Sequence, residues 1–315
     1  MKIVGILATM DALSQGYPFI EAVHSFLRWG DALYVADGSS DGTERILERF
    51  AKNRRIRVYR LRWSAEGEKG EAIGSAYNAL LRKARLEEDG REWVVEVQAN
   101  EVFHEDSHRW LRQLPEIFPG KAGFLIPYRS LHGTYMVEAL WRLRYAHMDR
   151  ELVIRGDAVA LNSRERYSPA RHLRMFAMEL WKTYVRPTDP YQRFFWYAEE
   201  GLEPAPIVPA FRYRVLLPGD TLEKHRRHVE LYRGIPEYVE LYRQVEAARR
   251  EARSLDEFWR ITARDFCRLR RCGHALPAHV PLEEHPRIMR DVLASGADRY
   301  SELDRSDLVE EIASA

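Results

Sequence analysis

Short apolar runs alternate with longer segments of helical periodicity through the first third of the chain. Runs rich in β-branched and aromatic residues predict strands, whereas apolar positions three and four residues apart predict helices. The predicted strands are Ile3–Ala8, Leu33–Ala36, Ile56–Leu61 and Trp93–Val97, and the helices between them are Phe19–Leu27, Thr43–Ala51 and Lys69–Ala84. Strands that alternate with helices over short connections predict an α/β fold with a mostly parallel sheet flanked by helices.

The pattern changes after residue 122. Strand-like segments lie at Phe124–Tyr128, Leu152–Arg155 and Phe211–Val215, separated by long aromatic-rich stretches, which favours a mixed sheet. Beyond Pro218 the spacing of apolar residues predicts amphipathic helices at Thr221–Arg233, Pro236–Arg253 and Ser254–Arg271, with two shorter helices in Pro281–Ala315. We therefore expect one domain over residues 1–217, in two halves (1–106 and 107–217), and a helical C-terminal extension over residues 218–315. These helices pack on the main domain or form a homodimer contact.

Composition narrows the class of protein. A chain of 315 residues with 45% hydrophobic content can bury a sizeable core. Its 49 basic and 48 acidic residues leave a net charge of +1, so we expect no nucleic-acid partner. The two cysteines are too few for a disulfide scaffold, and no apolar run reaches the roughly 20 residues of a transmembrane helix. With no signal-peptide pattern at its start, we expect a cytoplasmic protein.

Polar and small residues follow the predicted strands. The first strand leads to Thr9, the second to the run from Asp37 to Thr43 (DGSSDGT), and the fourth to the run from Gln98 to Glu101 (QANE). A loop from Gly67 to Gly70 precedes the third helix. Because ligands bind outside the carboxyl ends of strands in open α/β sheets, we expect these segments to converge on one crevice.

These motifs resemble those of the family 2 glycosyltransferases, which have the GT-A fold. The run from Asp37 to Thr43 is similar to their D-G-S-x-D-x-T loop, and Gln98 to Val102, followed by His104-Glu105, resembles a Q-A-D-E-V…H-E subgroup pattern. The resemblance covers residues 3–106 well and extends loosely through Lys224. Two positions depart from the pattern: Asn100 replaces an acid, and Tyr77 replaces the arginine of an Arg-Asn pair.

The resemblance implies an inverting glycosyltransferase, which moves a sugar from a nucleoside diphosphate to an acceptor hydroxyl. The nucleoside is most often uridine in such families. By this resemblance Asp37 binds the nucleobase or ribose. We expect the Thr9 backbone to hold the nucleoside with it and Asn100 to lie at the diphosphate, with Ser39 and Gln98 as further nucleotide-binding candidates.

The departing diphosphate needs positive charge. GT-A enzymes usually supply it with Mg²⁺ or Mn²⁺ bound by carboxylate oxygens. The amide of Asn100 offers an oxygen but no charge, so we expect a weakened metal site. In a metal-independent alternative, Arg212 and Lys69 meet the diphosphate, since Lys69 lies at a predicted helix start where backbone N–H groups favour anions.

An inverting transfer also needs a general base near the acceptor hydroxyl. Asp157, in a turn after a predicted strand, is the first choice, and Glu101 and Glu179 follow. The aromatic residues between Trp181 and Tyr197 either stack on acceptor sugar rings or pack in the core.

Several alternatives stay open at this point. A binding or scaffold protein that keeps the nucleotide pocket without turnover would explain the neutral Gln-Ala-Asn motif. A nucleotidyltransferase would need a glycine- and lysine-rich signature near the first strand, which the chain lacks. Alternating arginines along the third strand (Arg55, Arg57, Arg60 and Arg62) indicate either a polyanion surface or one polar strand face.

Overall fold

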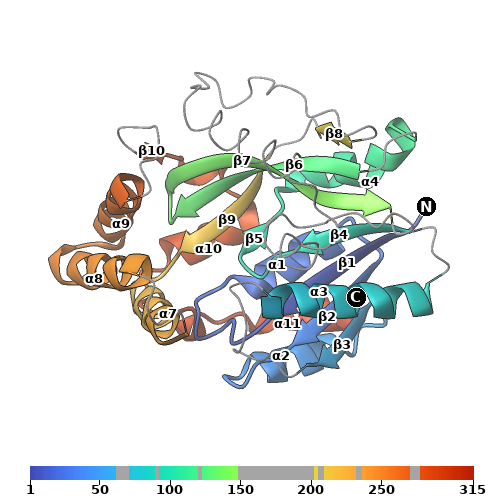
Figure 1. Ribbon diagram of the computed structural model, residues 1–315, viewed down its shortest axis with the longest axis horizontal. Helices are drawn as coiled ribbons and strands as arrows, with labels where there is room; N and C mark the ends of the chain where they lie inside the picture. Colours follow the sequence, from blue (N-terminus) through green and yellow to red (C-terminus); the bar gives the residue numbers. More distant parts are fainter. Residues whose placement is uncertain are drawn as a thin grey trace.

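The structure is a computed structural model that describes residues 1–61, 71–88, 92–119, 123–147, 202–204, 209–231, 236–269 and 277–315. The predicted strand Leu152–Arg155 lies outside these residues. The described strands form one ten-stranded sheet (Figure 1). They are β1 Ile3–Thr9, β2 Ala32–Asp37, β3 Ile56–Arg60, β4 Trp93–Val97, β5 Glu101–Val102, β6 Gly123–His132, β7 Tyr135–His147, β8 Leu202–Pro204, β9 Ala210–Val215 and β10 Ala278–His279.

The sheet has a parallel part and a mixed part. Its order is β3-β2-β1-β4-β7-β6-β9-β5, with β10 beside β7 and β8 beside β6. The pairs β2–β3, β1–β2 and β1–β4 are parallel, whereas β4–β7, β6–β7 and β5–β9 are antiparallel. The α/β prediction is therefore confirmed, as is the mixed sheet of the second half. Strand β7 was not predicted, although Gly133 between two strand-like runs is a hairpin signal.

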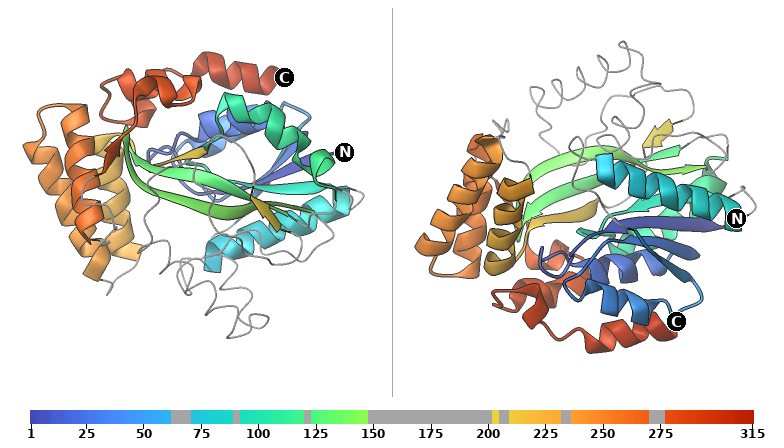
Figure 2. Two further views of the ribbon diagram at one scale, coloured as in Figure 1. Left: turned by 90° about the horizontal axis from the view of Figure 1, so that it is seen from above. Right: turned by 60° about the horizontal axis from the view of Figure 1, so that its bottom comes forward.

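Helices cover both faces of the parallel part. The described helices of the chain are α1 Phe19–Leu27, α2 Thr43–Phe50, α3 Glu71–Glu87, α4 His108–Ile117, α7 Pro218–Leu231, α8 Pro236–Glu251, α9 Leu255–Leu269, α10 Arg287–Ala294 and α11 Ser306–Ser314. Successive strand residues point to opposite faces. Val4 and Ile6 of β1 accordingly pack with α3, whereas Ile3 and Leu7 belong to the larger core that contains α1 and α2. Figure 2 shows α3 on one side of the sheet and α1 and α11 on the other.

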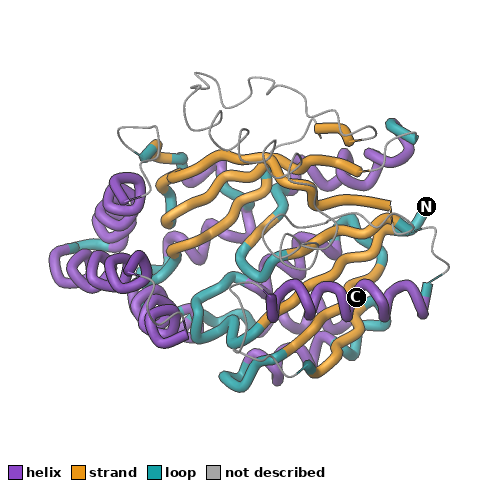
Figure 3. The backbone as a smooth tube through the Cα atoms, in the orientation of Figure 1, coloured by secondary structure: helices purple, strands orange, loops and turns teal. Residues whose placement is uncertain are grey.

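The C-terminal region consists of two groups of helices. Helices α7, α8 and α9 pack side by side next to the β6–β7 hairpin (Figure 3). Beyond α10 the chain returns to the first half, where Arg305 forms an ion pair with the buried Glu21 of α1, 2.9 Å apart, and Asn53 donates to the carbonyl of Ile312. The chain after residue 217 therefore contacts the first half, residues 1–106, directly. No described helix is long and apolar enough to cross a bilayer.

Candidate functional site

Three described strand ends meet at one edge of the sheet. Thr9 at the end of β1 lies opposite Asp37 at the end of β2, and the backbone N–H of Gly38 donates to the Thr9 carbonyl, 3.0 Å away. Strand β4 runs parallel to β1 on its other side and delivers Gln98 to the same edge. Within the described part of the chain, the buried hydroxyl of Thr9 and the amide oxygen of Gln98 have no hydrogen-bond partner. Buried polar groups are normally satisfied, so this edge offers unused groups to a ligand.

The Asp37 carboxylate is fixed by its own loop and by the neighbouring strand. Its Oδ1 accepts a hydrogen bond from the backbone N–H of Ser39, 2.8 Å away, and its Oδ2 forms an ion pair with Arg60. Arg60 lies opposite Asp37 in the parallel β2–β3 register, and its guanidinium also donates to the Ser39 carbonyl at 3.0 Å. Asp37 is 1% exposed, whereas the Arg60 side chain is 59% exposed. A ligand approaching Asp37 therefore meets Arg60.

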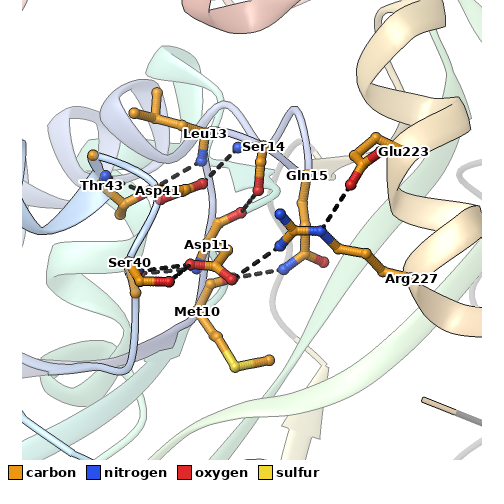
Figure 4. A network of polar contacts seen from close by, with 12 residues as sticks. Met10, Asp11, Leu13, Ser14, Gln15, Ser40, Asp41, Thr43, Glu223 and Arg227 are labelled. Atoms are coloured by element: carbon orange, nitrogen blue, oxygen red, sulfur yellow. Dashed lines mark hydrogen bonds and ion pairs between the residues drawn. The ribbon is translucent and has the colours of Figure 1, made fainter. Parts of the chain in front are cut away.

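The second acid of the motif, Asp41, holds two loops together. Its Oδ2 accepts from the backbone N–H of Ser14 at 2.7 Å and its Oδ1 from that of Thr43 at 3.0 Å, while the Thr43 hydroxyl accepts from the N–H of Leu13 (Figure 4). Burial would raise the pKa of Asp41, but the hydrogen bonds from Thr43 and Ser14 outweigh burial and lower it. This half of the motif stabilises the β1–α1 loop and presents no free carboxylate.

Asp11 links this loop to α7. It is the only non-glycine residue with positive φ (+51°) in the described part of the chain. Its backbone N–H donates to the Ser39 hydroxyl at 2.9 Å, and its Oδ1 accepts from the N–H of Ser40 at 2.8 Å. Its Oδ2 forms an ion pair with Arg227 of α7 at 2.9 Å, and Arg227 also contacts Glu223, as Figure 4 shows. Backbone strain of this kind persists only where surrounding contacts enforce it.

The segment after β4 is joined to β9. The side-chain amide of Asn100 donates to the Tyr213 carbonyl at 3.4 Å, and the Tyr213 N–H donates back to the Asn100 carbonyl at 2.8 Å. Glu101 is 1% exposed and lies opposite Arg212 in the antiparallel β5–β9 register. Directly opposed side chains lie on one face about 5 Å apart at Cβ, so Glu101 is placed to balance the charge of Arg212.

Basic side chains from β9 and α7 gather beside this segment. The ammonium of Lys224 donates to the Arg214 carbonyl at 2.9 Å and lies 4.6 Å from the centre of the Tyr17 ring. Burial, followed by the charges of Arg212 and Arg214, lowers the pKa of Lys224 to about 7. Arg214 is paired with Glu138, 2.9 Å away. An anion bound here would relieve the repulsion and restore the charge of Lys224.

The described residues do not fit a divalent metal ion well. Within them, no group of three or more His, Cys, Asp or Glu side chains could hold a metal. The motif after β4 offers a neutral amide whose nitrogen is bonded to Tyr213, and its acid, Glu101, is buried opposite Arg212.

Several predicted residues fall outside the described part of the chain: Lys69, Asp157, Glu179 and the aromatic segment from Trp181 to Tyr197. Their roles stay predictions. Tyr77 is buried, and its hydroxyl donates to the Val97 carbonyl at 3.1 Å.

Two residues at the candidate site, Arg60 and Arg227, were not predicted to lie there. Arg60 is the last residue of β3, as Asp37 is of β2, so its position at a strand end was the available signal. Arg227 gave none, because 216 positions separate it from Asp11.

Comparisons with known proteins give a likeness in structure. No family model matches the chain, and no curated protein matches it in sequence. Among solved structures, the chain is similar to S. aureus TarS, with 14% identity and a TM-score of 0.38; 100% of this chain is covered, and it spans 55% of the TarS chain. A shorter TarS structure, residues 1–349, gives the same identity and TM-score over 99% of this chain and 89% of that one.

A third similar structure is 4-diphosphocytidyl-2C-methyl-D-erythritol synthase, with 13% identity and a TM-score of 0.34 over 56% of this chain and 85% of that one. Identities below 25% reflect the fold alone, and likeness at these TM-scores does not bear on activity.

Proposed function

We propose that this protein is an inverting glycosyltransferase of the GT-A type, which passes a sugar from a nucleoside diphosphate, with uridine as the expected nucleoside, to an acceptor hydroxyl. The observation that carries this proposal is the placement of a basic cluster beside the strand ends that bear the family motifs. Arg212 lies on β9 beside Tyr213, whose backbone bonds to Asn100. Its charge also helps to lower the pKa of Lys224.

The nucleoside would bind at the ends of β1 and β2. There the Thr9 hydroxyl and the Gln98 amide oxygen have no hydrogen-bond partner among the described residues, and Asp37 and Ser39 form the fixed loop beside them. The diphosphate would lie toward Asn100, Arg212 and Lys224. A sugar linked to it would then face the second half of the domain, where the acceptor would bind.

In the proposed reaction, a carboxylate removes the proton from the acceptor hydroxyl as its oxygen attacks the anomeric carbon from the face opposite the diphosphate. The bond from that carbon to the diphosphate oxygen breaks, and the diphosphate leaves with the electron pair. Arg212 and Lys224 would stabilise the charge that develops there. We keep Asp157 as the proposed base, because Glu101 is buried opposite Arg212.

The charge of the leaving diphosphate can be balanced by a divalent metal ion or by protein cations. Mg²⁺ or Mn²⁺, where bound, would supply further positive charge at the diphosphate. The described residues favour protein cations in this role, since Asn100 brings no charge and its amide nitrogen is engaged by Tyr213. We therefore propose transfer that does not require a divalent metal.

The test is release of free nucleoside diphosphate from a panel of nucleotide sugars, measured with Mn²⁺ and with EDTA. Release that EDTA does not change supports the metal-independent enzyme, and release only with Mn²⁺ rejects metal independence. Lys224→Met should abolish release, whereas Arg226→Gln, which changes an exposed arginine of the same helix, should not.

A second candidate is a nucleotide-sugar-binding protein without turnover. It is favoured by the uncharged motif after β4 and by the engagement of Asn100 with β9. Binding of nucleoside diphosphates without release from any donor would support it. Absence of nucleotide binding would reject both candidates.

A further inference from the structure

We propose that Arg60 is a nucleobase-binding residue, whose guanidinium forms a platform on which the base of the donor stacks. This proposal rests on the proposed nucleotide site and adds a residue to it. It starts from the position of Arg60 at the carboxyl end of β3, directly opposite Asp37 in the parallel register.

The guanidinium is held at two points. One terminal nitrogen pairs with Asp37 Oδ2, and the other donates to the Ser39 carbonyl at 3.0 Å. Two anchors fix the plane of a guanidinium better than one does, because rotation about the last side-chain bonds would break a contact. The plane is therefore set before any ligand arrives.

The same side chain remains open to solvent. Arg60 is 59% exposed, whereas the Asp37 carboxylate beneath it is 1% exposed. A planar, weakly hydrated cation on a largely exposed side chain suits the flat surface of a nucleobase, and base stacking on such groups recurs in nucleic-acid recognition. Ribose offers no flat π surface, so the base is the part of the nucleoside that this platform fits.

The position of Arg60 over Asp37 also allows the opposite role, in which Arg60 blocks the nucleoside site. If Arg60 only blocked Asp37 in the free protein, a nucleoside would have to displace it, and its removal would strengthen binding. If Arg60 stacks with the base, its removal weakens binding. The sign of the change in nucleoside affinity therefore distinguishes a base-stacking role from a blocking role.

The experiment measures binding of UMP and of ribose 5-phosphate, which lacks the base, to the full-length protein. Arg60→Ala should weaken UMP binding about 10-fold and leave ribose 5-phosphate unchanged, a loss in the range of one base stack. Arg60→Lys keeps the charge but loses the planar fork, so it should also weaken UMP binding. Arg54→Ala removes an exposed arginine just before the same strand and should change neither ligand.

Each other outcome has a distinct meaning. Equal weakening of both ligands would show that Arg60 acts by holding Asp37, and stronger or unchanged UMP binding would overturn the platform. Full UMP affinity in Arg60→Lys would assign the effect to charge and overturn it as well. If the unaltered protein binds neither UMP nor UDP, the proposed nucleotide site itself fails, which is distinguishable from failure of Arg60 alone.

Discussion

Replacing Lys224 by methionine is expected to stabilise the protein while abolishing sugar transfer. The side chain is 8% exposed and lies between the Tyr17 ring and the Arg214 carbonyl, with Arg212 close enough to oppose its charge. Methionine has a similar length and no charge. The change therefore removes the cost of burying a charge, and with it the repulsion from Arg212 and Arg214, which the folded state bears and the unfolded state does not.

The magnitude follows from the pKa of Lys224, which burial and then Arg212 and Arg214 lower from 10.5 to about 7. Between these two pH values the unfolded chain binds one more proton than the folded chain, so the free energy of unfolding rises with pH. Over the whole range the free energy of unfolding rises by about 5 kcal/mol, and about 2 kcal/mol of this rise falls between pH 7 and pH 9. Loss of the hydrogen bond to the Arg214 carbonyl lowers the stability of the variant by about 1 kcal/mol. Lys224→Met should therefore gain about 4 kcal/mol at pH 6 and less as the pH rises.

Urea denaturation at pH 6, 7, 8 and 9 measures this directly. The unaltered protein and Arg226→Gln should both gain stability toward pH 9, whereas Lys224→Met should lack that contribution. The reasoning is refuted if Lys224→Met is less stable than the unaltered protein at pH 6, or if it shows the same rise. A stabilised variant that still releases nucleoside diphosphate would instead refute the proposed role of Lys224 at the diphosphate.

Three further predictions concern other parts of the structure. Gly133→Ala should destabilise the protein by about 3 kcal/mol in urea denaturation, because φ is +53° and the new Cβ would lie 1.9 Å from the rigid ring of Trp259; an unchanged midpoint would contradict the hairpin geometry. A double-mutant cycle of Asp11→Ala and Arg227→Ala should give a coupling energy of about 1 kcal/mol, and strict additivity would mean that the pair does not form in solution. Burial raises the pKa of Asp220 from 3.8 to about 7, so its contribution to stability is complete below pH 3.8 and is lost as the pH rises to about 7. In Asp220→Asn a decline in the free energy of unfolding on the order of 2 kcal/mol between pH 4 and pH 7 should be absent. Thermal unfolding across that pH range measures it, and a decline that persists in the variant would contradict the prediction.

Local patterns predicted the first half of the fold well because each element there is signalled by its own residues. Helix α1 begins and ends where the apolar spacing places it, and Asp37 ends β2 where the apolar run stops. Strand β5 is only two residues long and forms by pairing with β9, so no local sequence pattern predicts it. Helix α4 carries a proline and was also missed.

The site was predictable to the extent that its residues follow strands. Thr9, Asp37 and Gln98 were expected at one edge, and the parallel register brings their strand ends together. The motif did not reveal that Asp41 and Thr43 bind the β1–α1 loop, or that Asn100 bonds to β9. Such contacts depend on which backbone groups lie nearby in space, and the sequence alone does not fix those distances.

The ion pair between Asp11 and Arg227 has a consequence for the order in which the protein matures. These residues are 216 positions apart, and contacts of such long range close late because the intervening chain must first be ordered. During synthesis the N-terminal strands leave the ribosome well before α7 exists. The left-handed turn at Asp11 can then be held by Ser39 and Ser40 but not yet by Arg227, so a nascent chain can carry the whole DGSSDGT motif before α7 completes the contacts of the β1–α1 loop.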